Sequence, residues 1–510
     1  MTARWDEEYD VVVVGSGAGA MTGAYLAARQ GLRTVVLEKT CLLGGTTAYS
    51  GGACWLPGSA AQQRAGLPDS TASARDYLRA LLGDSHQDRQ EAFLAQAPLL
   101  VDSLEQDPLL TFEWRPFPEY FAAPGRVPVG RSLHVADVPL EDLGELAALI
   151  RPSVDRDRAG KSHRAAPLSG GGALIGRLLL AFHRTGCGTV RTTNLVDRLL
   201  VEDDRVVGVE ASHDGRRVRI RGQHGVLLAA GGFEGDQRLR DLHGVPGRST
   251  WSMAPDGTNT GEPLLAAVEA GADTELLDEA WWCPGLELPD GQTGFTLGLR
   301  GGLVVDGEGR RFANESLPYD RMGRAMAANP VAIPSYLVFD SRSAAQLPAI
   351  AVPGGRPEEH LAAGTWVQAE SLPELAAKIG VPAPALVATV ERFNGFAASG
   401  VDEDFHRGED PFDLFFATGD WPNKALLPVD QPPYFAARLV LSDLGTKGGL
   451  RTDAAGRVLR KDGNPLLGLY AAGNTAASLT GAVYPAPGAP IGTAMVFSSL
   501  AVEDMARRAS

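Results

Sequence analysis

The first forty residues carry a hydrophobic pattern typical of a strand, a helix and a second strand. The run Val11–Val14 is apolar, β-branched and followed by glycine, which predicts a buried parallel strand. Small and apolar residues continue from Met21 to Gln30 and stop at Gly31, which predicts a helix. A second apolar run, Thr34–Leu37, predicts the next strand. The three segments together predict a β–α–β unit.

The turn between the first strand and the helix has the composition of a nucleotide-binding turn. Gly15, Gly17 and Ala20 form the pattern G-x-G-x-x-A, in which the glycines let the chain turn tightly and approach a pyrophosphate. Glu38 ends the second strand, where a carboxylate can accept hydrogen bonds from ribose hydroxyls and would repel a 2′-phosphate. This segment therefore predicts a cofactor that contains ADP.

Further helices and strands follow from the same kind of pattern. Helical periodicity covers much of residues 58–108, and Ser371-Leu-Pro-Glu374 is a capping box that opens a helix to Ile379. Asp214-Gly215 is a hairpin signal. Other predicted elements are the helix Leu174–His183 and the strands Thr189–Asn194, Val196–Glu202, Arg205–Ser212, Arg217–Gly222 and Gly225–Ala229.

Turns of small residues recur at points where a cofactor could lie close to the backbone. They are Gly44-Gly45-Thr46, Ala230-Gly231 and Gly473-Asn474. The predicted C-terminal helix, Ile491–Arg508, begins at Gly492-Thr493. Its free amides and positive dipole suit the negative charge that collects at N1 and C2=O of a reduced flavin, so the pattern favours FAD over NAD.

A change in texture indicates a second domain. Residues 277–444 are rich in proline and aromatic residues, whereas the flanking parts share the pattern of the first forty residues. The predicted fold class is α/β. It comprises a Rossmann-like FAD-binding domain, similar to that of glutathione reductase, formed by residues 1–276 and 445–510, with an inserted α+β catalytic domain of residues 277–444.

Composition narrows the classes of partner and location. The net charge of the 510 residues is −15, which argues against nucleic acid or an anionic membrane surface as partner. The four cysteines form no C-x-x-C pair and the histidines show no metal spacing, so we expect neither a metal site nor a disulfide framework, and we expect a cytoplasmic location. No apolar run reaches the roughly 18 residues of a membrane span, so no transmembrane segment is expected.

With these pieces together, the chain resembles the FAD-dependent flavoproteins of the fumarate reductase and succinate dehydrogenase type and, within them, the 3-ketosteroid Δ1-dehydrogenases. The likeness covers essentially the full length. The motifs that carry it are Val14-Gly-Ser-Gly17, Leu37-Glu-Lys-Thr40, Gly44-Gly-Thr46, Phe117-Pro-Glu-Tyr120, Asn314-Glu-Ser-Leu-Pro-Tyr319, Ser442-Asp-Leu-Gly-Thr-Lys-Gly-Gly449, Leu469-Tyr-Ala-Ala-Gly-Asn474 and Tyr484-Pro-Ala-Pro-Gly488.

The resemblance implies a reaction and the residues that perform it. Enzymes of that family remove a hydride from C1 and a proton from C2 of a 3-oxosteroid. The resemblance makes Tyr319 the base that takes the C2 proton, with Tyr120 hydrogen-bonded to Tyr319. Tyr484 and the backbone N–H of Gly488 would hold the C3 carbonyl oxygen. The segment Pro485-Ala-Pro-Gly488 departs from the family where glycine is more common at its second place, but Gly488 itself is present.

The resemblance also implies a cofactor site, a substrate pocket and an unidentified electron acceptor. FAD would be held noncovalently, because Gly44–Gly52 contains no histidine for covalent attachment. Phe117 and Phe295 would line the steroid pocket, although core packing explains each of them nearly as well. The implied cofactor-binding residues are Gly15, Ser16, Gly17, Ala18, Glu38, Lys39, Gly44, Gly45, Thr46, Val196, Ala230, Gly231, Gly473, Asn474, Gly492 and Thr493.

Three other functions remain open from the sequence. A dehydrogenase that forms the C4–C5 double bond would need the same flavin and the same grip on the carbonyl. A fumarate reductase-like enzyme needs arginine and histidine beside the flavin, and the segment Thr475–Met495 contains neither. A non-catalytic flavin-binding protein could keep the same fold.

Overall fold

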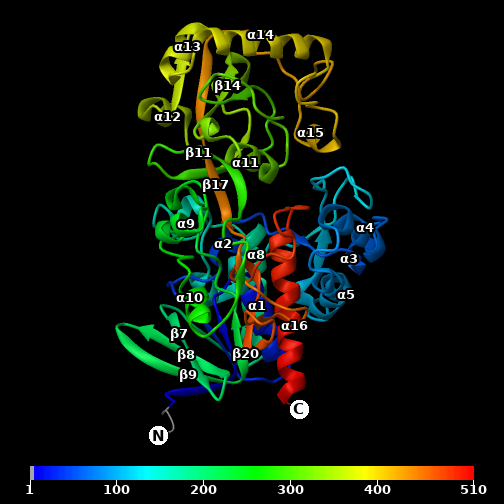
Figure 1. Cartoon of the computed structure of the whole chain (residues 1–510), viewed down its shortest axis with the longest axis vertical. Coiled ribbons are helices and arrows are strands. Elements are labelled where there is room, and N and C mark those ends of the chain that lie inside the picture. Colours follow the sequence, from blue (N-terminus) through cyan, green and yellow to red (C-terminus); the bar gives the residue numbers. More distant parts are fainter. Residues whose placement is uncertain (1–4, 510) are drawn as a thin grey trace. The chain divides into compact units, whose positions relative to one another are not determined.

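The computed structural model describes residues 5–509 of the chain (Figure 1). These residues form two compact units. Unit 1 consists of the residues up to Leu239, Ala254–Glu279 and the residues from Gly445 onward. Unit 2 consists of Arg240–Met253 and Ala280–Leu444.

Unit 1 opens with the β–α–β arrangement expected from its sequence. Strand β1 (Glu7–Val14) and strand β2 (Thr34–Leu37) pair in parallel, with Val11 opposite Thr34, and helix α1 (Ala18–Arg29) connects them. Strand β1 begins four residues before the predicted start because Glu7 and its neighbours pair with a third strand. The predicted unit is confirmed, with earlier starts for β1 and α1.

A parallel sheet brings the cofactor motifs of unit 1 to one edge. Five strands lie side by side in parallel, in the order β20 (Pro465–Ala471), β9 (Arg216–Leu228), β1, β2 and β6 (Gly188–Arg191). The carboxyl ends of parallel strands meet at the same edge of a sheet. The turns after β1, β2, β9 and β20 therefore gather along this edge, although more than 400 residues separate the first from the last.

The sheet continues into an antiparallel ribbon that corrects one prediction. Strand β9 is one continuous strand where the sequence predicted two, Arg217–Gly222 and Gly225–Ala229. Its first half pairs with β8 (Arg205–His213), and β1 pairs with Ile220–Gly222 and again with Gly225–Leu228 after an irregularity. The hairpin turn at Asp214-Gly215 is confirmed, with φ of +47° and +74°. Strand β7 (Leu195–Glu202) pairs with β8 in the same ribbon (Figure 1).

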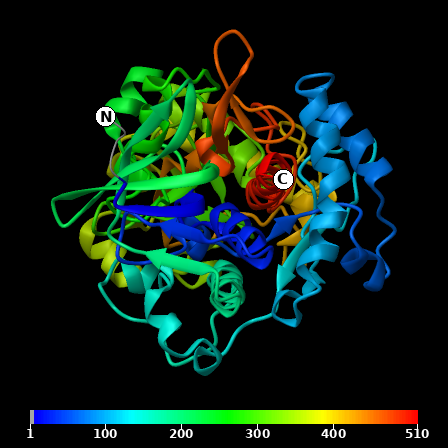
Figure 2. The ribbon, with the colours of Figure 1, turned by 90° about the horizontal axis from the view of Figure 1, so that it is seen from below.

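Helix α1 packs between the sheet and the C-terminal helix because one of its faces carries glycine. A Cβ atom at Gly19 would lie 3.0 Å from the Ala494 Cβ of helix α16 (Ala489–Ala509), and one at Gly23 would lie 2.6 Å from Leu227 of β9. Figure 2 shows α16 end-on as the red coil, beside the light-blue helices that include α5 (Gln87–Leu104). Gln96 of α5 donates hydrogen bonds to two side chains of α16.

Shorter elements complete unit 1. A small antiparallel sheet consists of β3 (Cys54–Trp55), β5 (Ser132–Val135) and β4 (Phe112–Trp114). The remaining helices are α2 (Gly45–Tyr49), α3 (Ala60–Arg64), α4 (Thr71–Leu82), α6 (Leu140–Leu143), α7 (Val154–Asp157), α8 (Gly170–Arg184), α9 (Gln237–His243, which crosses into unit 2) and α10 (Glu262–Glu269), and the remaining strands are β10 (Thr274–Glu275), β18 (Gly449–Leu450) and β19 (Arg457–Leu459).

Unit 2 is built on a seven-stranded sheet. Its order is β13 (Leu303–Val305), β14 (Ser335–Asp340), β17 (Tyr434–Thr446), β11 (Ala280–Glu287), β12 (Thr293–Leu297) and β15 (Ile350–Val352), with β16 (Trp366–Ala369) also paired to β17. Successive side chains of a strand point to opposite faces. Val338 of β14 accordingly joins one apolar cluster, whereas Leu337 and Phe339 join another.

Helices cover both faces of the unit 2 sheet. Helices α13 (Leu372–Ile379) and α14 (Ala383–Ser399) pack against the cluster that contains Val338. Helix α11 (Tyr319–Ala327) contributes Met322 to the other cluster. The predicted start of α13 is confirmed, because Ser371 accepts a hydrogen bond from the amide of Glu374. Two short helices, α12 (Pro357–Ala363) and α15 (Pro411–Phe415), complete the unit.

Residues 240–253 correct the predicted domain boundary. The sequence assigned them to the first domain, but they group with unit 2. Asp443 holds them there, because its carboxylate forms a buried ion pair with Arg240 and accepts a hydrogen bond from Ser252. The Met253 amide also donates to the Asp443 carbonyl. A link between residues so far apart in sequence leaves no local signal. The catalytic role of the inserted domain stays a prediction.

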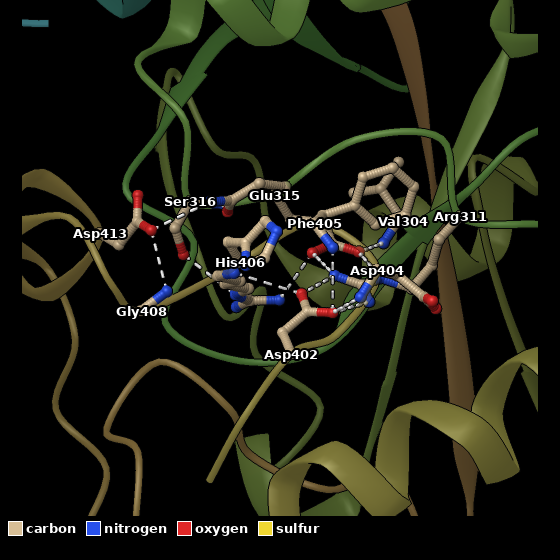
Figure 3. Close-up of polar contacts among 12 residues, drawn as sticks. Val304, Arg311, Glu315, Ser316, Asp402, Asp404, Phe405, His406, Gly408 and Asp413 are labelled. Carbon is tan, nitrogen blue, oxygen red and sulfur yellow. Dashed lines mark hydrogen bonds and ion pairs between the residues drawn. The ribbon is translucent and has the colours of Figure 1, made fainter. Parts of the chain in front are cut away.

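A network of buried charges joins two distant segments of unit 2 (Figure 3). Arg311 donates hydrogen bonds to both carboxylate oxygens of Glu315, at 2.7 and 2.8 Å, and to both of Asp402, at 3.1 and 2.7 Å. Arg407 is fully buried and donates to Glu315 at 3.1 Å. The aromatic ring of Phe393 lies against both guanidinium groups. Such a network is geometrically specific because each buried charge needs its partner.

The same network fixes the loop that leads into helix α11. Arg407 Nε donates to Ser316 Oγ at 3.0 Å, and Asn314 donates to Asp413 at 2.9 Å. The Ser316 amide in turn donates to the Asn314 side chain at 2.8 Å. Successive residues before Tyr319, the first residue of α11, are therefore held by partners from residues 402–413 (Figure 3).

Between residues 5 and 509, no helix is long and apolar enough to cross a membrane. Within the same range, no group of His, Cys, Asp or Glu side chains is arranged to hold a metal ion.

Replacing Glu315 by Gln should destabilise unit 2. The change leaves Arg407 buried opposite a neutral amide, and removing one partner of a buried pair typically costs about 3–5 kcal/mol of unfolding free energy. Urea unfolding followed by tryptophan fluorescence measures the loss. The matched control is Glu374→Gln, which removes the exposed partner of Lys378 and should leave the unfolding midpoint nearly unchanged. Equal urea midpoints for the two variants would show that the network does not stabilise unit 2.

Unit 2 should also lose stability in acid. Burial opposes ionisation of Glu315 and Asp402, but the neighbouring guanidinium groups lower the pKa of both carboxyls below their ordinary values. Their stabilisation is therefore present above the ordinary pKa of about 4 and is lost as pH falls through the lower folded-state pKa. Asp413 works in the opposite direction because burial raises its pKa. Urea midpoints of unit 2 should fall between pH 5 and 3, and less so in Glu315→Gln.

Candidate active site

The turn after β1 has the shape that a bound pyrophosphate requires. Gly15 has φ of +101°, and a Cβ there would lie 2.3 Å from the Ala229 carbonyl oxygen, so only glycine fits. At Gly17 a Cβ would meet only Thr47 Oγ1, at 3.4 Å, which leaves open space beside the chain. Gly17 is the N-cap of α1 and no side chain caps it, and the Ala18 amide donates to Thr47 Oγ1 at 3.1 Å. Amides at such a helix start suit a phosphate.

Glu38 is placed at the same edge as predicted. Its side chain is 8% exposed and accepts a 2.5 Å hydrogen bond from Ser16 Oγ and a 2.8 Å hydrogen bond from the Thr40 amide. Ser16 Oγ also accepts from the Gly44 amide at 2.9 Å. The structure therefore brings Ser16, Glu38 and Gly44 together. The Thr40 hydroxyl also donates to the Glu38 carboxylate, at 3.0 Å. A carboxylate has about four lone-pair sites, so the site left beyond these three contacts fits a ribose hydroxyl as a further donor.

Lys39 and Val196 lie near Glu38 but face other partners. Lys39 forms an ion pair with Glu262 of α10, at 2.9 Å. The Asn194 amide donates to the Glu38 carbonyl at 2.8 Å, which holds the start of β7 and Val196 beside this segment. The contribution of Lys39 and Val196 to cofactor binding stays a prediction.

The segment after β2 is more ordered than the predicted loop. Gly44 and Gly45 have φ of +110° and +48°, and Gly45 then opens the short helix α2. A Cβ at Gly45 would meet no atom within 4 Å, so the chain is open to a ligand there. Thr46 Oγ1 accepts a hydrogen bond from Asn259 at 3.1 Å. Gly171, at the start of α8, packs against the Thr47 carbonyl of this short helix with no room for a Cβ.

One threonine connects the turns after β9 and β20. Thr475 Oγ1 accepts from the Ala230 amide and donates to the Gly231 carbonyl, both at 2.8 Å. Thr475 follows Gly473 and Asn474 directly, so these two turns are joined as the sheet order requires. Sequence reasoning missed both Thr475 and Thr47. Thr47 directly follows Gly44-Gly45-Thr46 and Thr475 directly follows Gly473-Asn474, so their positions beside these motifs could have indicated them.

Helix α16 begins earlier than the sequence suggested. Its first residue is Ala489, and the Gly492 amide already donates to the Gly488 carbonyl at 2.8 Å, so the prediction of a helix start at Gly492-Thr493 is wrong. Thr493 Oγ1 donates back to the Ala489 carbonyl. Gly492 is needed for packing, because a Cβ there would lie 2.3 Å from the Trp55 carbonyl oxygen. The positive end of the helix dipole therefore lies near Gly488.

Four of the proposed substrate residues meet in unit 1. The rings of Tyr120 and Tyr484 pack edge to face with centroids 5.3 Å apart, and Phe117 packs against Tyr120 at 6.5 Å. The Tyr120 amide donates to the Pro485 carbonyl at 3.0 Å. Gly488 has φ of +83°, and a Cβ there would lie 2.5 Å from the Ala53 carbonyl, so glycine is required. Phe117, Tyr120, Tyr484 and Gly488 are thus brought together from distant parts of the sequence.

The other two proposed residues meet in unit 2. Tyr319 is buried, and its ring packs edge to face on Phe295 of β12, with centroids 4.9 Å apart. Helix α11 lies directly on β11, because a Cβ at Gly323 would come within 2.7 Å of the Cys283 amide. The helix, the strand contact and the charged network before Tyr319 together determine where this phenol lies within unit 2.

Comparison with known proteins shows the family to which the chain belongs. A family model described as "FAD binding domain" matches residues 10–491. The chain is 44% identical to a 3-oxosteroid 1-dehydrogenase of Rhodococcus opacus, with 99% of both chains covered, and 36% identical to a 4-oxocyclohexanecarboxylate 2-dehydrogenase of Sinomonas cyclohexanicum, with 98% of this chain and 93% of the relative covered.

The fold of the chain is also similar to that of a solved structure. The structure of 3-ketosteroid Δ1-dehydrogenase from Sterolibacterium denitrificans, in complex with 1,4-androstadiene-3,17-dione, superposes with a TM-score of 0.90 at 31% identity, covering 98% of this chain and 100% of that one. The glycines and the carboxylate at the sheet edge of unit 1 fit FAD, and the family model spans that edge. The chain therefore belongs to the FAD-binding flavoproteins and, within them, to the family of the 3-oxosteroid 1-dehydrogenases.

Proposed function

We propose that the protein catalyses the FAD-dependent 1,2-dehydrogenation of 3-oxosteroids. The observation that carries the proposal is the meeting of Tyr120, Tyr484 and Gly488 in the unit that also holds the nucleotide-binding edge. The names of the relatives and the steroid bound in the solved structure support the same substrate class. FAD supplies an acceptor for the hydride that leaves C1.

The grip on the ketone makes the C2 proton removable. A proton beside a ketone is acidic only because the carbonyl oxygen can take up negative charge as an enolate. We assign the Tyr484 hydroxyl and the Gly488 N–H as the two donors to the C3 oxygen. Donors aimed at developing charge are each worth about 3 kcal/mol of transition-state stabilisation. The backbone contact of Gly488 with Ala53 fixes the direction of its peptide, so this donor is preorganised.

Tyr319 is the proposed base that takes the C2 proton. A phenol has an ordinary pKa of about 10, so its phenolate needs support. A hydrogen bond from Tyr120 to the phenolate oxygen would stabilise the charged form. Phe117 and Phe295 each pack on one of these tyrosines and would supply apolar surface for the steroid rings.

We also propose that FAD is held noncovalently and that the enzyme works in the cytoplasm. The four cysteines, all within the described residues, are free thiols, as is usual in a reducing compartment. Retention of the yellow cofactor through acid precipitation of the protein would contradict noncovalent binding.

Replacing Tyr319 by Phe should abolish flavin reduction by androstenedione and leave the colour of the enzyme intact. The change removes the base but keeps the ring that packs on Phe295. Anaerobic stopped-flow absorbance measures the bleaching of the flavin, and product analysis should show the 1,4-diene. The matched control is Tyr336→Phe in the same unit, on the opposite face of the sheet, which should reduce the flavin at nearly the wild-type rate.

Three results would contradict the proposal. If the flavin of the Tyr319→Phe variant bleaches at the wild-type rate, Tyr319 is not the base. If no 3-oxosteroid bleaches the flavin of the wild-type protein, the proposed function is wrong. If a 5α-saturated steroid yields a 4-ene without a 1,2 double bond, the C4–C5 dehydrogenase is favoured.

The rate of flavin reduction should rise with pH. The base form of Tyr319 is the phenolate, whose fraction increases up to tenfold per pH unit until pH reaches the phenol pKa. Single-turnover reduction measured from pH 6 to 10 should therefore climb and then level off. A flat profile across this range would show that proton transfer to a phenolate does not limit the reaction.

A further inference from the structure

The carbonyl clamp, defined as residues Tyr484–Gly488, accepts hydrogen bonds from several other segments, and the Tyr77 hydroxyl is one of the donors, to the Pro485 carbonyl at 2.8 Å. Three of the other donors belong to segments that also meet at a buried ion pair. The Tyr120 amide donates to the Pro485 carbonyl at 3.0 Å, and the Trp55 amide donates to the Gly488 carbonyl at 3.0 Å. Ser132 Oγ donates to the Pro487 carbonyl at 2.7 Å. These donors come from three segments of unit 1 that are far apart in the sequence.

The same three segments converge on one buried ion pair. The carboxylate of Glu119 accepts two hydrogen bonds from Arg131 Nη1, at 2.5 and 2.6 Å. It also accepts from Trp55 Nε1 at 2.9 Å and from the Val127 amide at 2.8 Å. Glu119 and Arg131 are both 0% exposed. The pair is therefore fully removed from solvent, and four hydrogen bonds reach the carboxylate.

Arg131 carries the network to two further segments. Its Nε donates to Asp69 Oδ1 at 2.6 Å, and its Nη2 donates to Ser73 Oγ at 2.9 Å and to the Gly125 carbonyl at 2.6 Å. Every nitrogen of the guanidinium thus has an acceptor. A buried charge with all its donors used has one favourable orientation, because any rotation would leave a desolvated group unsatisfied.

Sequence adjacency transmits this rigidity to the clamp. Glu119 precedes Tyr120, and Arg131 precedes Ser132, so one peptide bond separates each charged residue from a donor to the clamp. Trp55 serves both sites, since its indole binds Glu119 and its amide binds Gly488. A shift of the ion pair would move all three donors at once.

We propose that Glu119 and Arg131 are positioning residues that aim the Tyr484 hydroxyl and the Gly488 N–H at the substrate carbonyl, an inference that rests on the proposed function. Neither charge touches the substrate in this account. Loss of the pair should weaken polarisation of the C3 carbonyl and leave the apolar contacts to the steroid rings in place. Misplacement of catalytic groups by about 1 Å can cost about 100-fold in rate. A 10- to 100-fold lower kcat with a nearly unchanged KM is therefore expected.

The test uses Glu119→Gln in the full-length, FAD-loaded enzyme. Glutamine keeps the size of the side chain and an acceptor for Trp55, but it removes the charge opposite Arg131. The probe is 1,4-androstadiene-3,17-dione labelled with ¹³C at C3, which is a product and does not turn over. Infrared difference spectroscopy of the bound probe reports the C3 carbonyl stretch, which falls as donors polarise the bond. A 3-deoxy analogue of the same steroid reports binding of the rings alone.

In the wild type the carbonyl stretch should lie below its value in water. In Glu119→Gln it should return most of the way toward that value, while the Kd of the 3-deoxy analogue stays within about twofold. The matched control in unit 1 is Asp504→Asn, whose carboxylate accepts from Tyr470 and Arg508 at 2.8 Å near the C-terminal end of α16. This control should keep the wild-type carbonyl shift.

Several results would overturn the inference. A wild-type carbonyl shift in Glu119→Gln would show that the pair does not aim the donors. Equal losses of carbonyl shift and of 3-deoxy affinity would show a purely structural role. Arg131→Lys is measured in the same way, so that failure of Glu119→Gln to fold does not end the test, and failure of both variants to bind FAD would also count against positioning. If the wild type binds no 3-oxosteroid, the proposed function fails instead.

Discussion

Close approach of backbone to backbone at three glycines is the constraint on which unit 1 depends. Gly15 lies against the Ala229 carbonyl, which joins the turn after β1 to the turn after β9. Gly488 lies against Ala53, just before strand β3, and Gly492 lies against Trp55 in β3, so the carbonyl clamp and the start of α16 pack on the same short segment. No other residue fits at these points. The cofactor edge and the proposed substrate grip therefore depend on contacts that no side chain could replace.

Buried charge appears beside two of the proposed catalytic tyrosines. Glu119 directly precedes Tyr120 in unit 1, and Glu315 lies four residues before Tyr319 in unit 2. Both glutamates are buried and paired with buried arginines, Arg131 and Arg407. Desolvated ion pairs are often no more stabilising than apolar residues of the same volume, but their geometry is specific. Each pair therefore fixes the segment that carries one of the proposed catalytic tyrosines.

The sequence predicted most of the features that depend on neighbouring residues. Strand, glycine turn and helix at the start of unit 1 follow from periodicity and from glycine, and the hairpin at Asp214-Gly215 and the start of α13 follow from turn and capping chemistry. Its errors arose where distant residues decide. Strand β9 is continuous because β1 pairs with it on both sides of the irregularity between Gly222 and Gly225, and residues 240–253 join unit 2 because Asp443 holds them.

The same distinction applies to the site. Tyr120, Tyr484 and Gly488 could be named because they stand in motifs, and the structure brings them together across more than 350 residues. Glu119, Arg131 and Trp55 could not be named. A glutamate beside a tyrosine and an isolated arginine look like surface residues in a linear chain. Only the folded arrangement shows that both are buried and that their sequence neighbours hold the clamp.

The residues proposed for the two halves of the chemistry, proton removal and carbonyl polarisation, are held by separate charged networks. Removal of the C2 proton needs a base and a polarised ketone at the same time, and the residues proposed for these two roles belong to different units. Glu119 and Arg131 hold the segments of the proposed ketone donors in unit 1, whereas Glu315 and Arg407 hold the loop before the proposed base, Tyr319, in unit 2. The hydrogen bonds of each network join residues of one unit. Damage to one should therefore change carbonyl polarisation or proton transfer separately, and steps that are coupled in the reaction can be separated by variants.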